Sequence, residues 1–324
     1  MNKSNRSLVS IIPDYLEYLE IEKGLAQLSV KNYDQFLNKF KSWLDANYKD
    51  LKPHQLTADI IWKYRLFLSH SEANLKTHIK LKKVTQNFYL IALRGFLSYL
   101  IEKDIETLPP DKIKLAKDDL KERVVKFLSL EQLERLLMAT DLTTIEGLRD
   151  RTILETLFST GLRIAELVSL NREQFNLKHI KNEDELEITI IGKGSRPRTV
   201  YFSRRCLDWI IKYLEKRQDV DMPLFISHQQ NKKADQSEHR LTPRSIQRIL
   251  KKYTIAAGLP VMATPHTLRH TYATDLLNQG VDLRTVQEFL GHKNIMTTQI
   301  YTHVTNKRLK DIHKKFHSGQ NMKN

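Results

Sequence analysis

The chain has 324 residues, of which 40% are hydrophobic, and it contains only 10 glycines and 9 prolines. This length exceeds one typical domain, so we expect two compact, helix-rich domains. Its 53 lysines and arginines exceed its 38 aspartates and glutamates by 15, so the surface should attract polyanions. DNA and RNA are the commonest such partners, although an anionic membrane or a ribosome would suit the same charge.

The single cysteine, Cys206, excludes an internal disulfide framework and a four-cysteine zinc site. We expect it to pack between helices in a protein of the reducing cytosol. Near the N-terminus, Asp14, Glu17 and Glu20 interrupt an apolar run, and no stretch of the sequence is long enough to span a bilayer. The sequence therefore predicts a soluble, unsecreted, cytoplasmic protein without a membrane partner.

Residues 7–103 carry apolar side chains at three- and four-residue spacing, without a strong strand pattern, which predicts a small helical bundle. The segment 76–83 is rich in lysine. Lys80, Lys82 and Lys83 belong either to a solvated loop or to a surface that contacts phosphates. Both interpretations stay open.

Two adjacent prolines, Pro109 and Pro110, break the helical pattern, since each lacks an N–H and restricts the residue before it. We therefore expect a helical domain over residues 1–107, a linker over 108–125 and a second domain over 126–324.

In the second domain, a capping pattern at residues 129–132 precedes an apolar run, and one or two helices are expected between 147 and 170. Runs 187–191 and 199–202 alternate like strands around a glycine-containing turn, which places Lys193 near the tip of a hairpin.

The polar run 227–240 predicts a surface loop, and a helix should restart at 241–250 with Pro243 in its first turn. Arg244 and Arg248, four residues apart on that helix, form a face that either lies against DNA or is merely solvated.

The segment 264–270 starts a helix at a proline and places His266, Arg269 and His270 on one side of it. Such a cluster of cationic groups requires an anion. The alternative is a metal site formed by the two histidines, but the zinc-protease pattern needs a glutamate where Thr267 stands.

Three further residues complete an ordered set: Arg163 in the run Thr160-Gly161-Leu162-Arg163, His292 after Leu290-Gly291, and Tyr301 nine residues later. Taken singly, an arginine of this kind is more often salt-bridged on a helix, and such a tyrosine is more often a half-buried aromatic. Together, the order of arginine, hairpin lysine, His-x-x-Arg, Leu-Gly-His and tyrosine resembles the tyrosine recombinase and phage integrase family, particularly its Xer branch. The resemblance covers nearly the whole chain.

The resemblance implies a mainly α fold, in which a helical, SAM-like core-binding domain and an α+β catalytic domain with a small hairpin clamp DNA between them. It also implies the catalytic set, in which two arginines bind phosphate, one lysine protonates the leaving oxygen, two histidines line the pocket and a tyrosine attacks. In this sequence the residues that match these positions are Arg163, Arg269, Lys193, His266, His292 and Tyr301. His270 looks like a supporting residue.

Elementary chemistry explains why these residue types occur together. Attack of a phenolate on a phosphodiester concentrates negative charge on the non-bridging oxygens, which paired arginine N–H groups can stabilise. A free tyrosine has a pKa near 10, so Tyr301 needs a base or a strongly positive site, and His266 is the candidate base. One helical turn after Arg163, Glu166 would orient or neutralise neighbouring cations.

We therefore expect a site-specific recombinase that cuts and rejoins double-stranded DNA at recombination sites through a 3′-phosphotyrosyl intermediate, with neither metal nor ATP and no cofactor. No GxxxxGK[ST] loop and no set of carboxylates typical of a two-metal nuclease occurs. The family resemblance implies a tetramer on two paired sites, either of one chain or with a second recombinase, in the cytoplasm at the nucleoid. In such a tetramer the tail stripe Leu309, Ile312 and Phe316 would dock into a neighbour, although it could also pack within its own chain.

Two alternatives stay open: a type IB topoisomerase-like enzyme that relaxes one duplex, and a catalytically idle DNA-binding accessory protein. Nor does the sequence separate chromosome-dimer or plasmid resolution from the integration and excision of mobile elements.

Overall fold

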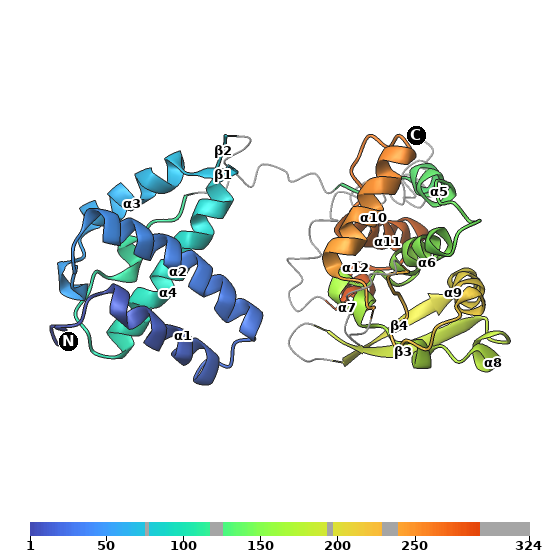
Figure 1. The fold of residues 1–324 in the computed structure, drawn as a ribbon, viewed down its shortest axis with the longest axis horizontal. Coiled ribbons are helices and arrows are strands. Elements are labelled where there is room, and N and C mark those ends of the chain that lie inside the picture. The colour runs from blue at the N-terminus through green and yellow to red at the C-terminus, as the bar shows by residue number, and fades with distance from the viewer. Residues whose placement is uncertain (75–77, 117–125, 193–196, 229–238, 292–324) are drawn as a thin grey trace, which may run out of the picture. The chain divides into compact units, whose positions relative to one another are not determined.

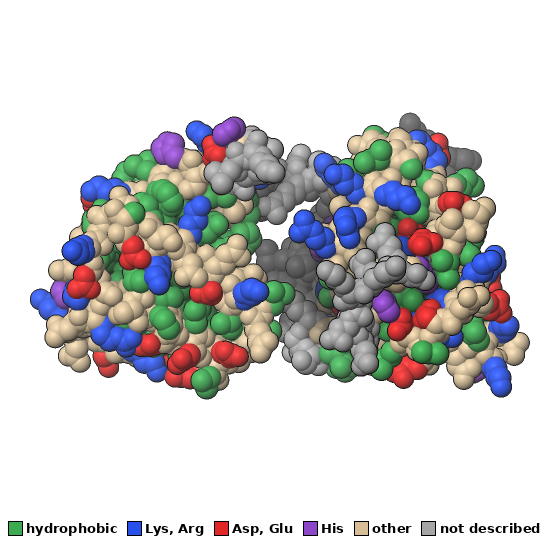
Figure 2. All heavy atoms as spheres, viewed as in Figure 1, with side chains coloured by type: hydrophobic (Ala, Val, Ile, Leu, Met, Phe, Trp, Pro, Cys, Tyr) green, Lys and Arg blue, Asp and Glu red, His purple; other side chains and the backbone are tan. Residues whose placement is uncertain are grey.

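The computed structural model describes residues 1–74, 78–116, 126–192, 197–228 and 239–291. The chain divides into two compact units, Met1–Lys121 and Glu122–Asn324 (Figure 1). The predicted linker at 108–125 lies around this division, and its limits stay a prediction. None of the described helices is both long and apolar enough to cross a membrane. Figure 2 shows lysine and arginine side chains spread over the visible face of each unit.

The first unit is a helical bundle, as the apolar spacing predicts. Aromatic and leucine side chains fill its core, including Phe40, Tyr64 and Phe96, each at most 1% exposed. The central helices α2 and α4 pack against each other, and α1 packs against α2. Its elements are η1 (Val9–Ile11), α1 (Ile12–Ile21), α2 (Gln27–Asn47), η2 (Pro53–Gln55), α3 (Ala58–His70), β1 (Glu72–Asn74), β2 (Ile79–Lys80), α4 (Lys83–Glu102) and η3 (Pro110–Lys112).

The expectation that this unit lacks strands was wrong at one place. Strands β1 and β2 form a short antiparallel ladder in which Glu72 pairs with Lys80. Because these strands are three and two residues long, they are too short for an alternating pattern to mark them in the sequence. Lys80 lies in β2, Lys82 directly precedes α4 and Lys83 is its first residue. All three are exposed, which fits either interpretation of this basic segment.

In the described part of the second unit, helices and one hairpin surround a large apolar core. Helix α6 packs against α9 on one side and against α11 on another, and both hairpin strands contact α9. Its elements are α5 (Leu130–Met138), α6 (Ile145–Thr160), α7 (Ile164–Ser169), η4 (Arg172–Gln174), α8 (Leu177–Ile180), β3 (Glu185–Ile191), β4 (Pro197–Ser203), α9 (Arg204–Lys216), α10 (Pro243–Ala256), α11 (Pro265–Gln279) and α12 (Leu283–Leu290).

Local sequence signals in this unit are confirmed. Ser129 caps α5 and exchanges hydrogen bonds with Gln132, at 3.2 Å from the Gln132 amide to the Ser129 hydroxyl and 3.1 Å in return. The antiparallel strands β3 and β4 pair from Glu185 with Ser203 to Ile191 with Pro197, and their alternate residues face the core. Pro243 is the first residue of α10. The tip of the hairpin, with Lys193, lies outside the described residues.

Cys206 belongs to α9, and its side chain packs in the core of the second unit, as expected, with 1% exposed. Burial raises the pKa of its thiol to about 12. Because the thiolate is the reactive form, we expect iodoacetamide at pH 8 to alkylate the native protein at least about a hundredfold more slowly than the denatured protein. Mass spectrometry of timed samples measures both rates, and equal rates would contradict the burial of this thiol.

Candidate active site

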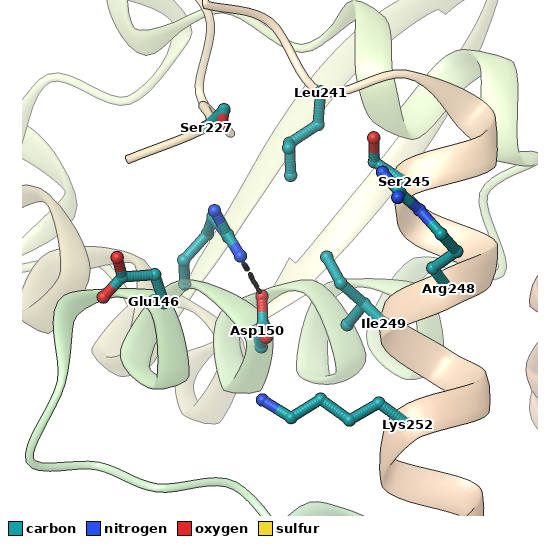
Figure 3. A pocket seen from close by; sticks show the side chains of 9 residues that line it. Glu146, Asp150, Ser227, Leu241, Ser245, Arg248, Ile249 and Lys252 are labelled. Atoms are coloured by element: carbon teal, nitrogen blue, oxygen red, sulfur yellow. Dashed lines mark hydrogen bonds and ion pairs between the residues drawn. The ribbon is translucent and has the colours of Figure 1, made fainter. Parts of the chain in front are cut away.

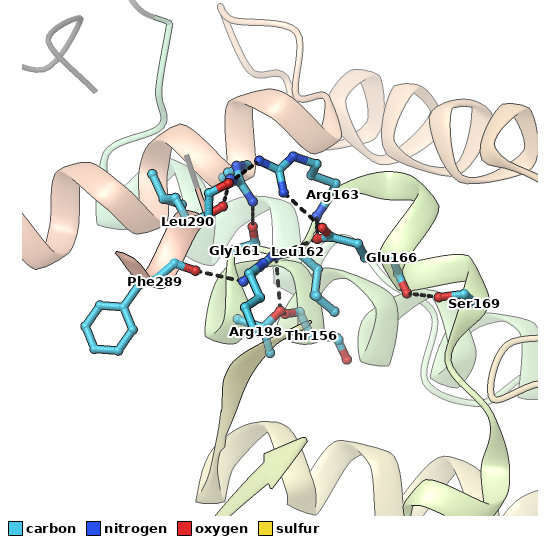
Figure 4. A network of polar contacts seen from close by, with 12 residues as sticks. Thr156, Gly161, Leu162, Arg163, Glu166, Ser169, Arg198, Phe289 and Leu290 are labelled. Atoms are coloured by element: carbon cyan, nitrogen blue, oxygen red, sulfur yellow. Dashed lines mark hydrogen bonds and ion pairs between the residues drawn. The ribbon is translucent and has the colours of Figure 1, made fainter. Parts of the chain in front are cut away.

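Three arginines from three separate elements converge on the C-terminal end of α12. Arg198 of β4 donates to the Phe289 carbonyl at 2.7 Å, and Arg163, the N-cap of α7, donates to the Gly291 carbonyl at 3.0 Å. Arg269 of α11 donates to the carbonyl between them, that of Leu290. Three successive carbonyls thus each accept one guanidinium N–H (Figure 4).

The chemistry of a helix end explains this convergence. The last carbonyls of α12 have no intrahelical donor, and they form the negative end of the helix dipole, which cations stabilise. Gly291 ends the helix in the left-handed region, at φ +61°, where glycine is the favoured residue. The arginines therefore hold the backbone immediately before His292, the first residue beyond the described part of the chain.

A single buried carboxylate ties two of these arginines together. Glu166 of α7 is 6% exposed, and it accepts hydrogen bonds from the Arg163 backbone amide at 2.7 Å and the Arg163 guanidinium at 2.9 Å. Arg198 donates to the same carboxylate at 2.7 Å. Burial alone would raise the pKa of Glu166, but these donors and the charge of Arg198 outweigh it and hold the pKa below its ordinary value. An ionised Glu166 therefore orients both cations, as its spacing from Arg163 suggests.

Helix α11 carries the predicted His266, Arg269 and His270. Thr264 caps it and Pro265 opens it, and Arg269, 5% exposed, donates to the Gly161 carbonyl at 2.5 Å. His266 is exposed, whereas His270 is half-buried. Burial, followed by the neighbouring His266 and Arg269, lowers the pKa of His270 to about 4, so that its imidazole is neutral at pH 7. Within the described ranges, no group of three or more potential metal ligands is found.

The turn between α6 and α7 brings Arg163 and Arg269 to the same place. Gly161 ends α6 at φ +59°, and a Cβ atom there would lie 2.5 Å from a ring carbon of Tyr272. Only glycine fits this conformation and this close approach. As a result, the Gly161 carbonyl meets Arg269 while Arg163, two residues later, reaches the same helix end. Of the six predicted catalytic residues, Arg163, His266 and Arg269 are described, and Lys193, His292 and Tyr301 lie outside the described residues.

Comparison with known proteins identifies the family of this chain. The model of the phage integrase family matches residues 126–308, and that of the phage integrase N-terminal SAM-like domain matches residues 12–104. The chain belongs to the phage integrase family. Tyrosine recombinase XerD of Listeria monocytogenes is 34% identical over 314 residues, covering 95% of this chain and 98% of that protein. XerD of Lacticaseibacillus casei is 36% identical over 310 residues, with the same coverage.

Solved structures of phage integrase relatives share the fold. XerH site-specific recombinase bound to a palindromic difH substrate, in a post-cleavage complex, superposes with a TM-score of 0.67 at 23% identity, covering 97% of this chain and 85% of that one. A lambda integrase dimer bound to a COC′ core site gives 0.64 at 16% identity, covering 90% and 97%. The predicted fold class and family are thereby confirmed. This phage integrase family member is a tyrosine recombinase, a DNA strand-exchange enzyme, and neither alternative activity is favoured.

Arg198 is the site residue that sequence reasoning missed in this recombinase. It lies on the same face of β4 as Val200 and Phe202, which are both buried in the core. A charged residue on the apolar face of a strand requires a buried partner, and this was the available signal. In the sequence it looks like one more basic residue of a lysine- and arginine-rich hairpin.

The predicted basic face of α10 is exposed at Arg244 and Arg248. Beside it, a pocket of about 450 Å³ opens between α6 and α10 (Figure 3). Arg149 and Asp150 pair within its wall at 2.7 Å, and Tyr253 donates to the same aspartate at 3.0 Å. Since these buried polar groups satisfy one another, they form a structural network. The pocket lining comprises Glu146, Arg149, Asp150, Ser227, Leu241, Ser245, Arg248, Ile249 and Lys252.

Proposed function

We propose that this recombinase cleaves and rejoins DNA strands at specific sites through a covalent 3′-phosphotyrosyl link to Tyr301. The observation that carries the proposal is the convergence of Arg163 and Arg269 on the residues just before His292. Two guanidinium groups at one point can bind both non-bridging oxygens of a phosphate. The chain that follows carries the nucleophile.

In the proposed reaction, the Tyr301 oxygen attacks the scissile phosphorus and the 5′ oxygen of the next nucleotide leaves. Arg163 and Arg269 stabilise the charge that develops on the non-bridging oxygens, and His292 donates a hydrogen bond to the phosphate. His266, exposed on α11, accepts the phenol proton. Lys193 gives a proton to the leaving oxygen, because a bare alkoxide leaves poorly.

Cleavage exchanges one phosphodiester for another, since a P–O bond to tyrosine forms as the P–O bond to the 5′ oxygen breaks. A free 5′ hydroxyl from another strand can then reverse the step and release Tyr301. The energy of the original bond is kept, so the proposed chemistry needs neither ATP nor a cofactor.

The proposed partner is double-stranded DNA carrying recombination sites, which agrees with a net charge of +15 and with the DNA named in the XerH and lambda integrase complexes. Exposed Arg244 and Arg248 of α10, and Lys80, Lys82 and Lys83 near the start of α4, are the proposed DNA contacts outside the catalytic set. We propose a tetramer on two paired sites, of one chain or with a second recombinase, acting at the nucleoid in the cytoplasm. Chromosome-dimer resolution and mobile-element exchange both suit this chemistry.

A covalent trapping experiment tests the proposed function. A binding screen first selects a DNA site, which is then nicked next to the scissile position so that the cleaved fragment diffuses away. With EDTA present, the wild-type protein should form an adduct that survives a denaturing gel, and Tyr301→Phe should form none while binding the DNA equally well. Lack of an adduct with wild-type protein on DNA that it binds would argue for an accessory or partner-activated role.

A further inference from the structure

Arg198 is almost fully enclosed, with 11% of its side chain exposed. Its two terminal nitrogens donate to the Phe289 carbonyl and to Glu166, each at 2.7 Å, and its Nε atom is buried without a hydrogen-bond partner. A buried, incompletely satisfied guanidinium is costly. The free-energy cost of burying this guanidinium suggests that Arg198 has a functional role as well as a packing role.

The partners of Arg198 connect it to the proposed catalytic groups. Glu166 also binds both the backbone and the side chain of Arg163, so Arg198 and Arg163 share one carboxylate. The Phe289 carbonyl comes directly before the two carbonyls held by Arg269 and Arg163. Arg198 therefore contacts both the carboxylate that orients one arginine and the helix end on which all three arginines meet.

Gly291 lies against the aliphatic part of the Arg198 side chain. A Cβ atom at Gly291 would lie 2.6 Å from Cδ of Arg198 and 2.9 Å from its Nε. The backbone that leads to His292 thus lies directly against this side chain, in a contact that only glycine permits. The position of Arg198 consequently sets where the chain leaves α12.

We propose that Arg198 is a positioning residue for strand cleavage, holding Arg163 through Glu166 and holding the C-terminal end of α12 through the Phe289 carbonyl. This inference rests on the proposed function. The side chain of Arg198 is only 11% exposed, and its terminal nitrogens bind Phe289 and Glu166, so it acts through these neighbours and not on DNA. Lysine cannot replace it, because one ammonium on a flexible stem does not reproduce the fixed fork that spans the two acceptors.

The test compares Arg198→Met and Arg198→Lys with wild type by single-turnover cleavage of the nicked DNA, at protein concentrations that saturate binding. We expect either variant to slow cleavage by about a hundredfold, as loss of an active-site electrostatic contact does, while the dissociation constant for DNA changes less than about threefold. Because the measurement separates the rate from the affinity, a general loss of folded protein does not imitate this result. Thermal melting reports the folded state, and if the methionine variant does not fold, the lysine variant decides.

A double-mutant cycle with Arg163→Ala tests the connection itself. If Arg198 acts by holding Arg163 and the helix end that Arg163 caps, adding Arg198→Met to the Arg163→Ala variant should slow cleavage by less than about threefold. This is far less than the effect of Arg198→Met on the wild-type protein.

Arg205→Met is the matched control. Arg205, on α9, also pairs with a buried carboxylate, that of Glu155, at 2.9 Å. When Arg205 is replaced, Arg151 still pairs with Glu155. This control should cleave at the wild-type rate.

The outcomes separate the two proposals. Wild-type protein that forms no adduct on bound DNA defeats the proposed function itself. If wild type forms the adduct and a folded Arg198 variant cleaves as fast, the function stands and Arg198 is not a positioning residue. Fully additive effects of Arg198→Met and Arg163→Ala would likewise overturn the inference.

Discussion

Arg269→Lys is expected to slow strand cleavage by about a thousandfold, the upper range for losing one preorganised donor to a developing oxyanion. Arg269 is 5% exposed, and its guanidinium donates to the carbonyls of Gly161 and Leu290, which fixes the plane of the group. Lysine keeps the charge but has neither the plane nor the second donor. Single-turnover cleavage of the nicked DNA measures the loss.

Arg135→Lys is the matched control for this substitution. Arg135 lies in the same unit, and its guanidinium also donates to two backbone carbonyls, those of Ala257 and Gly258, at 2.7 and 3.1 Å. It is exposed and belongs to no proposed catalytic contact, so cleavage should keep the wild-type rate. If Arg269→Lys retained more than about a tenth of wild-type activity, a fixed pair of donors at this position would not be required.

The second large effect concerns stability. Asp150→Ala is expected to destabilise the second unit by about 3–5 kcal/mol, the usual cost of removing one partner from a buried ion pair. The side chains of Arg149 and Asp150 are only 9% and 4% exposed, and Tyr253 donates to the same carboxylate. The substitution leaves a buried guanidinium without its counter-ion and a buried hydroxyl without its acceptor. Chemical denaturation followed by circular dichroism gives the free energy of unfolding.

Asp208→Ala provides the comparison for Asp150→Ala. Asp208 pairs with Arg204 one turn away on α9, but these side chains are 46% and 39% exposed, so solvent already screens the pair. We expect less than about 1 kcal/mol for this change. Equal effects of the two substitutions would mean that burial does not govern the strength of the Arg149–Asp150 pair.

Short-range chemistry made much of this fold predictable from sequence. Capping side chains, prolines at helix starts and strand alternation each depend on neighbouring residues, so the start of α5, the start of α10 and the β3–β4 hairpin appear in the sequence where the structure has them. The β1–β2 ladder was missed because two short strands contain too few residues to show a period.

The same distinction between short-range and long-range features applies to the candidate site. Arg163 and Arg269 could be predicted as site residues because each occurs in a motif of adjacent residues that resembles a known family. Arg198 occurs in no such motif, and its role depends on contacts with Glu166 and Phe289, which come from distant parts of the chain. Long-range pairing of this kind leaves only a weak trace in a single sequence, here a charged residue on the apolar face of a strand.

The convergence of three arginines on one helix end also has a consequence for the safety of the genome. Arg163, Arg198 and Arg269 belong to a helix start, a strand and a second helix, and they meet only when α12 has docked. A partly folded or newly synthesised chain can hold the proposed tyrosine, but it has no assembled phosphate-binding group with which to use it. Under the proposed function, strand breakage therefore requires the folded second unit, and folding intermediates bound to DNA through their positive charge alone would leave it intact.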